Sequence, residues 1–382
     1  MNKTIAIGCD SKAVEMKEAI KKLQPNSATR WKITDAIRTD VLNGLAGENV
    51  MKKFINDPYD VVDEMLEGFV QVHSGIVRKI DGVRVLVRVD APTSGKVGLV
   101  SGGGSGHKPA FIGYLGQGLL DAVAVGDIFT SPPPNACLEA ARCANAGRGV
   151  LFLLGNYAGD VMNFAMAADL AKAQGIEVAR CISTDDVASA PKGEEHRRRG
   201  VVGSILCWKV AGAKAASGGT LQDCKTVVDR MNTNTRTIGV ALSPCTVPAK
   251  GSPTFTLAEN EMEYGVGHHG EAGIEKTALL PVDRVVDRMV QEIIPDLPFT
   301  AGDEVLLMIN GLGGTPQMEL YIAYRRVRQL AEAAGLKVKL SLVGEFFTGL
   351  EMGGFSVTLS RLDAELEQLI QAPARACMFK SL

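Results

Sequence analysis

The sequence predicts an α/β protein: two α/β domains with largely parallel or mixed sheets covered by helices, plus an N-terminal appendage. Its 382 residues exceed what one hydrophobic core usually supports, which favours two domains. From residue 96 onward, short apolar runs alternate with longer stretches of helical periodicity, and this pattern indicates parallel strands with helices on both faces. Glycine-bearing loops follow several apolar runs, at the place where open parallel sheets bind ligands.

Residues 1–50 are the predicted appendage. An apolar run at residues 5–7 and a helical pattern from Val14 to Leu23 indicate one strand and one helix, which Pro25 ends. This opening resembles the first strand and helix of ribose-5-phosphate isomerase B-type proteins over about two dozen residues. Ser11 stands where that family usually has histidine, so no isomerase activity is inferred.

Residues 51–235 are predicted to form the first α/β domain. It opens with a helix that Asp57 can cap, with Pro58 at its first position. The strands expected after it are residues 97–100, 122–125, 150–154 and 177–182, and the helices are residues 135–145 and 161–173.

Residues 236–382 are predicted to form the second α/β domain. The expected strands are residues 237–242, 304–309 and 337–343, and the expected helix is residues 317–334.

Composition excludes several classes of function. Forty-one Lys and Arg stand against 43 Asp and Glu, scattered along the chain, so nothing favours nucleic acid or a membrane surface as a partner. No apolar run approaches the ~20 residues that span a bilayer. The eight cysteines include no C-x-x-C pair, and the N-terminus has no export signal, so we expect a cytoplasmic protein with reduced thiols.

The loop SGGGSGHKP, residues 101–109, follows an expected strand. Its glycines would let the backbone approach a ligand, and the loop contains Gly104, His107 and Lys108. It is neither a Walker A sequence nor a dinucleotide fingerprint, because His107 separates Gly106 from Lys108 and a proline follows. A small polar ligand is the favoured interpretation, and a tight turn that needs glycine is the alternative.

Asp160 lies in the loop GNYAGDVMNF, residues 155–164, just before an expected helix. It could cap that helix as a carboxylate, or it could act as a general base that removes a hydroxyl proton. The local sequence is consistent with either role.

His268 and His269 are adjacent in the loop YGVGHHGEAG, residues 264–273. The pair lacks the spacing and the neighbouring cysteines of a zinc site, so we expect no metal. A structural role and a nucleophilic role, in which a neutral imidazole adds to a carbonyl carbon, stay open. The basic run HRRRG, residues 196–200, is interpreted as a solvated loop, and NGLGGTP, residues 310–316, as a strand-to-helix turn.

From Met51 to the C-terminus, these loops in this order resemble the dihydroxyacetone-binding subunit of dihydroxyacetone kinase. The motifs that carry the resemblance are RVDAPTSGKVGLVSGGGSGHKP, DIFTSPPP, NYAGDVMNF, CTVPAKGSPTFTLAENEMEYGVGHHGEAG and NGLGGTPQMELY. The resemblance implies that His269 bonds covalently to the ketone carbon as a hemiaminal. It further implies that His107 and Asp160 assist proton transfer from the hydroxyl to be phosphorylated, and that Gly104 offers a backbone contact.

The resemblance also implies partners. ATP or ADP with Mg would bind a separate helical domain, which is either fused to the substrate domain or supplied as a partner subunit. We expect the 382 residues to leave no room for that helical domain. We expect this chain to bind no cofactor or metal itself, to form a homodimer, and to transfer no phosphoryl group alone.

Four positions depart from the family pattern. Lys108 stands where Glu is common, Gly155 where Lys is common, Ala272 where Pro is common, and His268 where the family often has an aliphatic residue. Either Lys108 partly replaces the missing lysine, or the emptied space admits a larger ketose such as erythrulose. We therefore count Lys108 and His268 among the candidate substrate-binding residues.

Two rival functions are weighed against the kinase component. A non-catalytic ketose sensor or coactivator would keep the carbonyl-binding histidine but need not keep Asp160 and His107, and this sequence has all three. An isomerase is disfavoured because only one strand and one helix of that family are present.

Overall fold

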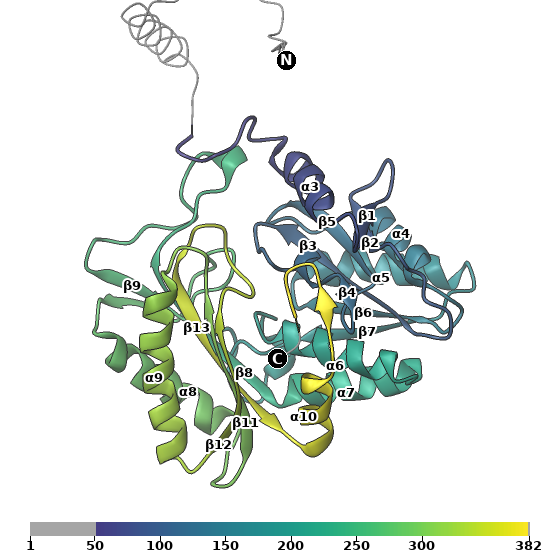
Figure 1. The fold of residues 1–382 in the computed structure, drawn as a ribbon. Coiled ribbons are helices and arrows are strands. Elements are labelled where there is room, and N and C mark those ends of the chain that lie inside the picture. Colours follow the sequence, from purple (N-terminus) through teal and green to yellow (C-terminus); the bar gives the residue numbers. More distant parts are fainter. Residues whose placement is uncertain (1–50, 381–382) are drawn as a thin grey trace, which may run out of the picture. The chain divides into compact units, whose positions relative to one another are not determined.

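The computed structural model describes residues 51–380 (Figure 1). The strand, the helix and the appendage predicted within residues 1–50 lie outside the described residues and stay predictions.

The first sheet is mixed and six-stranded, in the order β1-β2-β5-β3-β6-β7. Its strands are β1 (Val77–Lys79), β2 (Val85–Arg88), β3 (Gly98–Ser105), β5 (Ala122–Ile128), β6 (Val150–Gly155) and β7 (Val178–Ser183). The four predicted strands form its parallel part, β5-β3-β6-β7, while β1 and β2 add an antiparallel edge. The predicted α/β class with mixed sheets is thus confirmed.

Helices cover both faces of this sheet: α4 (Pro134–Ala144) and α5 (Ala158–Lys172) on one, α6 (Ser204–Ala216) and α7 (Leu221–Thr233) on the other. The period-two geometry of a strand is the reason, because alternate side chains point to opposite faces. In β6, Phe152 and Leu154 pack in the core with α4 and α5, whereas Leu151 and Leu153 pack in the core with α6 and α7.

The second sheet is also six-stranded, in the order β10-β9-β8-β13-β11-β12. Its strands are β8 (Thr235–Ser243), β9 (Glu261–Tyr264), β10 (Glu275–Ala278), β11 (Glu304–Gly311), β12 (Lys337–Gly344) and β13 (Gly353–Leu362). Helices α8 (Val282–Asp296) and α9 (Gln317–Ala333) cover its outer face (Figure 1). The described part also includes α3 (Val61–Val72), α10 (Ala364–Gln371), β4 (Gly116–Gln117) and β14 (Arg375–Ala376).

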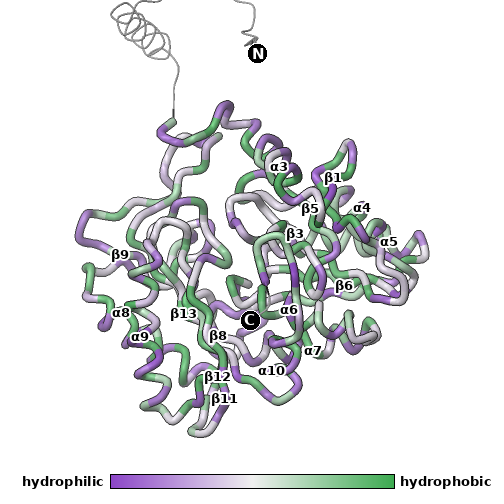
Figure 2. The backbone as a smooth tube through the Cα atoms, viewed as in Figure 1, coloured by the Kyte–Doolittle hydropathy of each residue, from purple (hydrophilic) through white to green (hydrophobic). Residues whose placement is uncertain are grey.

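One hydrophobic core joins the two sheets. It contains Leu151 and Leu153 of the first sheet, Leu306 and Met308 of the second, and the inner faces of α6, α7 and α10. Figure 2 shows hydrophobic segments along the inner strands and hydrophilic segments mainly toward the outside. The predicted division at residue 235 coincides with the start of β8, and as a domain boundary it stays a prediction.

Two predicted helix starts are wrong. Helix α3 begins at Val61 with Asp60 at its N-cap, because Asp57 instead accepts a hydrogen bond from the backbone N–H of Tyr59 (2.8 Å) in an Asx turn. Helix α5 begins at Ala158 with Tyr157 at its N-cap, so Asp160 lies within the first turn and does not cap it. No helix within residues 51–380 is long and apolar enough to cross a membrane.

The basic run at residues 196–200 is not the solvated loop that we predicted. Arg198 is fully buried and binds Asp296 through two hydrogen bonds of 2.8 and 2.6 Å, and Arg236 binds the same carboxylate. Only His196 and Arg197 are exposed as expected, and Arg197 pairs with Glu194. The single carboxylate at the end of α8 is therefore the ion-pair partner of two buried guanidinium groups.

We expect Asp296→Ala to lower the free energy of unfolding by about 3–5 kcal/mol, because it leaves two buried cations unpaired. Asp283→Ala on the same helix is the matched control: its partner Arg325 is exposed, so the loss should stay below about 1 kcal/mol. Urea unfolding followed by circular dichroism measures both. Equal losses in the two variants would contradict this assignment.

Candidate active site

A small cavity of about 20 Å³ lies at the carboxyl ends of β3 and β6, against loops from the second sheet. It is lined by Gly104, His107, Phe111, Gly155, Tyr157, Asp160, Gly200, His268, His269 and Phe347. Five of the six predicted site residues are thus brought together, and Lys108 is not among the lining residues. A larger apolar cavity of about 210 Å³ beside β8 and α8 contains none of them.

His107 is held rigidly at the end of β3 and is only 2% exposed. Its Nδ1 lies 2.6 Å from the carbonyl oxygen of Thr348, and its ring stacks on Phe129 with centroids 5.0 Å apart. A carbonyl only accepts, so Nδ1 donates and Nε2 is left facing the cavity. Burial, together with the neighbouring His269, holds the pKa of His107 well below its usual range, so the ring is neutral near pH 7.

Glu271 orients His269. One carboxylate oxygen lies 2.6 Å from Nδ1 of the ring, and the other accepts the backbone N–H of the same residue at 2.9 Å. Burial alone would raise the pKa of Glu271, but the hydrogen bond and charge of His269, a backbone hydrogen bond and the charge of Arg199 together outweigh it and hold that pKa below its usual range. A carboxylate only accepts, so Nδ1 carries the hydrogen and Nε2 offers its lone pair to the cavity.

The two imidazoles meet through their Nε2 atoms, which lie 3.1 Å apart. Since both Nδ1 atoms donate elsewhere, this contact is a hydrogen bond only when one extra proton lies between the rings. Without that proton, two lone pairs face each other across the cavity. The arrangement therefore provides one nucleophilic nitrogen and one basic nitrogen side by side.

Asp160 is buried in the first turn of α5, with 7% exposure, and its Oδ1 has no hydrogen-bond partner. Burial raises its pKa to about 6, although Ser131 and His269 partly oppose the shift. A carboxylate with one unpartnered oxygen and a raised pKa inside a cavity has the properties of a general base.

Two glycines permit neighbouring segments to approach closely around the cavity. A Cβ on Gly104 would lie 2.6 Å from the backbone nitrogen of Thr130, and one on Gly267 would lie 2.2 Å from a carboxylate oxygen of Glu271. Phe129, beside the first contact, has a positive φ of 54°, a strained conformation that places its ring against His107 and His269.

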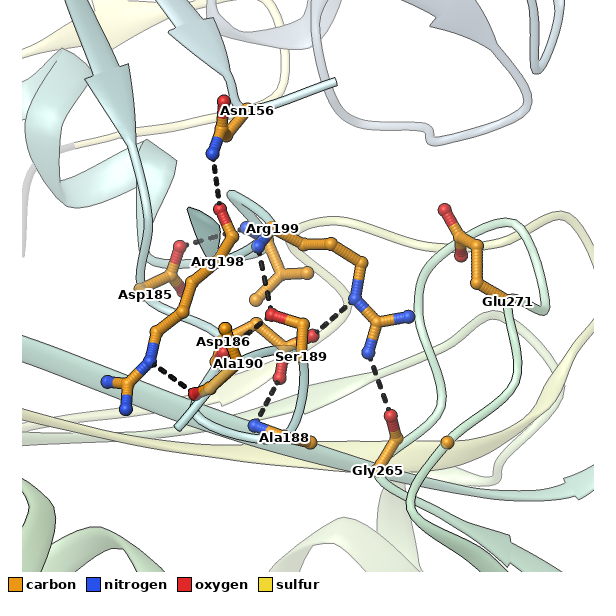
Figure 3. Close-up of polar contacts among 12 residues, drawn as sticks. Asn156, Asp185, Asp186, Ala188, Ser189, Ala190, Arg198, Arg199, Gly265 and Glu271 are labelled. Carbon is orange, nitrogen blue, oxygen red and sulfur yellow. Dashed lines mark hydrogen bonds and ion pairs between the residues drawn. The ribbon is translucent and has the colours of Figure 1, made fainter. Parts of the chain in front are cut away.

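Arg199 links the histidine loop, through Gly265, to Asp186 (Figure 3). Its guanidinium donates to Asp186 at 2.8 Å and to the carbonyl oxygen of Gly265 at 2.9 Å. Its positive charge also helps to lower the pKa of Glu271. Asn156, next to the cavity, donates to the carbonyl oxygen of Arg198 at 2.8 Å. This hydrogen bond links the loop after β6 to the segment that contains Arg199.

Asn310, at the end of β11, fixes the aromatic wall of the cavity. Its side chain accepts the backbone N–H of Phe347 and donates to the carbonyl oxygen of the same residue, both at 2.9 Å. No site role was predicted for Asn310, Arg199 or Glu271. Of these, only Glu271 carried a signal, as a carboxylate two residues after a histidine.

Lys108 and His268 differ in their placement. Lys108 is half-buried beside the cavity, and its backbone carbonyl accepts a hydrogen bond from Thr348 (3.0 Å). Its assignment to the substrate stays a prediction. His268 lines the cavity and stacks on Phe347 with centroids 4.3 Å apart.

Fold and site together define a class of α/β protein that presents a carboxylate-oriented imidazole, a second imidazole and a buried carboxylate to one small ligand. The chain belongs to the Dak1 domain family, whose model matches residues 67–378.

Proteins similar to this chain include kinases, a kinase subunit and a co-activator. The chain is 44% identical to the dihydroxyacetone-binding subunit of PTS-dependent dihydroxyacetone kinase 1 of Listeria innocua, over 82% of this chain and 95% of that protein. It is 40% identical to the L-erythrulose kinase of Pectobacterium atrosepticum, over 86% of this chain and 56% of that protein. Among solved structures, it resembles a dihydroxyacetone kinase operon co-activator, with 33% identity, a TM-score of 0.77, and coverage of 82% of this chain and 97% of the other.

Proposed function

We propose that this chain is the substrate-binding subunit of a dihydroxyacetone kinase, a phosphotransferase component that holds its ketose as a hemiaminal on His269. The observation that supports this proposal is the orientation of His269 by Glu271, which directs Nε2 into a cavity that is also lined by Asp160, whose Oδ1 has no partner.

The covalent step is an addition. The Nε2 lone pair of His269 forms a bond to the carbonyl carbon, the π pair of the C=O bond moves to oxygen, and that oxygen takes up one proton. Glu271, already at Nδ1, balances the positive charge that develops on the ring or accepts its Nδ1 proton. No atom leaves, so the whole ketose is added. A polyol has no electrophilic carbon and is excluded by its chemistry.

Asp160 and His107 then serve the hydroxyl that is phosphorylated. The Asp160 carboxylate accepts the hydroxyl proton as the oxygen attacks phosphorus, while the neutral His107 hydrogen-bonds to the substrate and assists the proton transfer. The adduct holds this hydroxyl in place, which lowers the entropic part of the barrier. Gly104 contributes a backbone contact on the same wall.

A three-carbon ketose fits the proposal better than a four-carbon one. The cavity has room for about one water molecule, so any ketose must separate His107 from His269 on entry. The position of the missing lysine offers little extra space, because a Cβ on Gly155 would lie 3.2 Å from the ring of Tyr157 and from the carbonyl oxygen of Gly200. Erythrulose is the second candidate, since one relative is named an erythrulose kinase.

The phosphoryl donor belongs to a partner in this proposal. ATP or ADP with Mg would bind a nucleotide-binding subunit, and the chain itself would act in the cytoplasm as a homodimer. Two relatives agree with this division. The Listeria protein is named a dihydroxyacetone-binding subunit, and the Pectobacterium kinase is longer than the region that this chain matches.

A ketose-binding coactivator is the second candidate function, because one similar solved structure is described as such. A coactivator needs no general base. The buried Asp160, with its unpartnered Oδ1, therefore favours the kinase component.

Dihydroxyacetone labelled with carbon-13 at its carbonyl tests the proposal. On binding, we expect the ketone signal to move to the region of tetrahedral carbon, and the intact mass to rise by the whole ketose without loss of water. Glycerol should change neither. An unchanged ketone signal at saturation would reject the hemiaminal. Addition of the nucleotide-binding subunit of a dihydroxyacetone kinase should start phosphoryl transfer, whereas turnover of the isolated chain with ATP would reject the two-component scheme.

A further inference from the structure

His268 has no polar partner within the described residues. It is 3% exposed and lines the cavity, yet neither Nδ1 nor Nε2 makes a hydrogen bond. A neutral imidazole carries one donor and one acceptor, and leaving such groups buried without partners lowers stability. Burial, followed by the proximity of His269, lowers the pKa of His268 to about 3, so the ring is neutral when a ligand arrives.

Packing does not require this histidine. Its ring lies against Phe347, with centroids 4.3 Å apart and planes inclined by 31°. An aliphatic or phenyl side chain would provide the same apolar contact without two unpaired nitrogens. The polar atoms of His268 therefore need another explanation.

The unpaired atoms around the cavity are complementary to a hydroxylated ligand. Besides His268, the hydroxyl of Tyr157 and Oδ1 of Asp160 are buried without partners on the same walls. In the proposed adduct, Asp160 takes the hydroxyl that is phosphorylated, which leaves the second arm of the ketose without an assigned side-chain contact.

We propose that His268 is a specificity-determining residue that hydrogen-bonds to the hydroxyl on the second, non-phosphorylated arm of the ketose. The site would thereby select ketones with hydroxyl groups on both sides of the carbonyl. This inference rests on the proposed function, because it assumes that the ketone carbon lies at His269. It explains why a polar side chain stands at a position where an aliphatic one would pack.

Dihydroxyacetone and hydroxyacetone test the inference, because both are ketones and differ only in the second hydroxyl. We expect the wild-type chain to bind dihydroxyacetone more tightly, and His268→Leu to reduce this preference about tenfold or more while hydroxyacetone binding stays within about twofold. His268→Asn and His268→Gln keep a hydrogen-bonding group near the position of one or the other ring nitrogen. At least one of them should retain part of the preference. Calorimetry gives the affinities, and carbon-13 spectra give the adducts.

The outcomes separate the two proposals. An unchanged preference in His268→Leu, or an equal loss for both ketones, would overturn the role of His268. If neither ketone forms an adduct in the wild type, the proposed function fails, while the affinity ratio still reports on His268. Circular dichroism checks that each variant is folded.

Discussion

His269→Ala should abolish the covalent adduct and lower kcat/KM for dihydroxyacetone, measured with the nucleotide-binding partner, by about 10³-fold or more. The physical reason is the loss of Nε2, the nitrogen that Glu271 directs into the cavity. Without the adduct, the reacting hydroxyl is no longer held beside Asp160. The carbon-13 spectrum should then show free ketone at every concentration.

His73→Ala is the matched control for this experiment. His73 follows helix α3 and contacts Phe69, and it does not line the cavity. It should leave both the adduct and the rate unchanged. An adduct that survives in His269→Ala would show that another residue is the nucleophile, with His107 and His268 the nearest alternatives.

The strands that meet at the site could be predicted from the sequence because they are continuously apolar. Strand β6, VLFLLG, is buried along nearly its whole length, and an apolar run of this length bounded by glycines is typical of a parallel strand. The loops that follow β3 and β6 then indicated where ligands bind. The grouping of Gly104, His107 and Asp160 around one substrate came from the resemblance to the dihydroxyacetone-binding subunit, because the local sequence left the role of Asp160 open.

Other elements could not be predicted, since their burial does not follow hydrophobicity. Strand β13 buries Thr358 and Ser360, which hydrogen-bond across the sheet to Thr237 and Thr235 at 2.8 and 2.9 Å. Helix α6 packs between the two sheets and is buried on almost every side, so it lacks the apolar stripe by which a helix is recognised.

The supporting residues of the site depend on contacts between distant parts of the chain. Arg199 and Gly265 are 66 positions apart, and His107 and Thr348 are 241 apart. No periodicity in a single sequence connects such pairs. The three consecutive arginines therefore looked solvated, although one of them positions the histidine loop.

Asp160→Asn should lower kcat by about 10²–10⁴-fold while the ketose adduct still forms. The carboxylate is the proposed base, and the amide has nearly the same shape but does not accept a proton. In the wild type, kcat should fall as the pH decreases through about 6, because Asp160 must be ionised. Rate measurements from pH 5 to 8 with the partner subunit, together with carbon-13 spectra of the adduct, check this. A variant that keeps the wild-type rate would reject Asp160 as the base.

The same substitution should stabilise the folded chain, which a merely structural carboxylate would not do. The folded-state pKa of Asp160 is raised from 3.8 to about 6, so the folded chain binds a proton more tightly than the unfolded chain does. Wild-type stability therefore falls as the pH rises from about 4 to 6, by up to about 3 kcal/mol. Asp160→Asn lacks this loss, and its advantage in urea unfolding should be largest at pH 8 and disappear near pH 4. Lower stability of the variant at pH 8 would indicate that the carboxylate stabilises the fold. Slower catalysis combined with higher stability is the result expected of a buried general base, which lowers stability and serves catalysis.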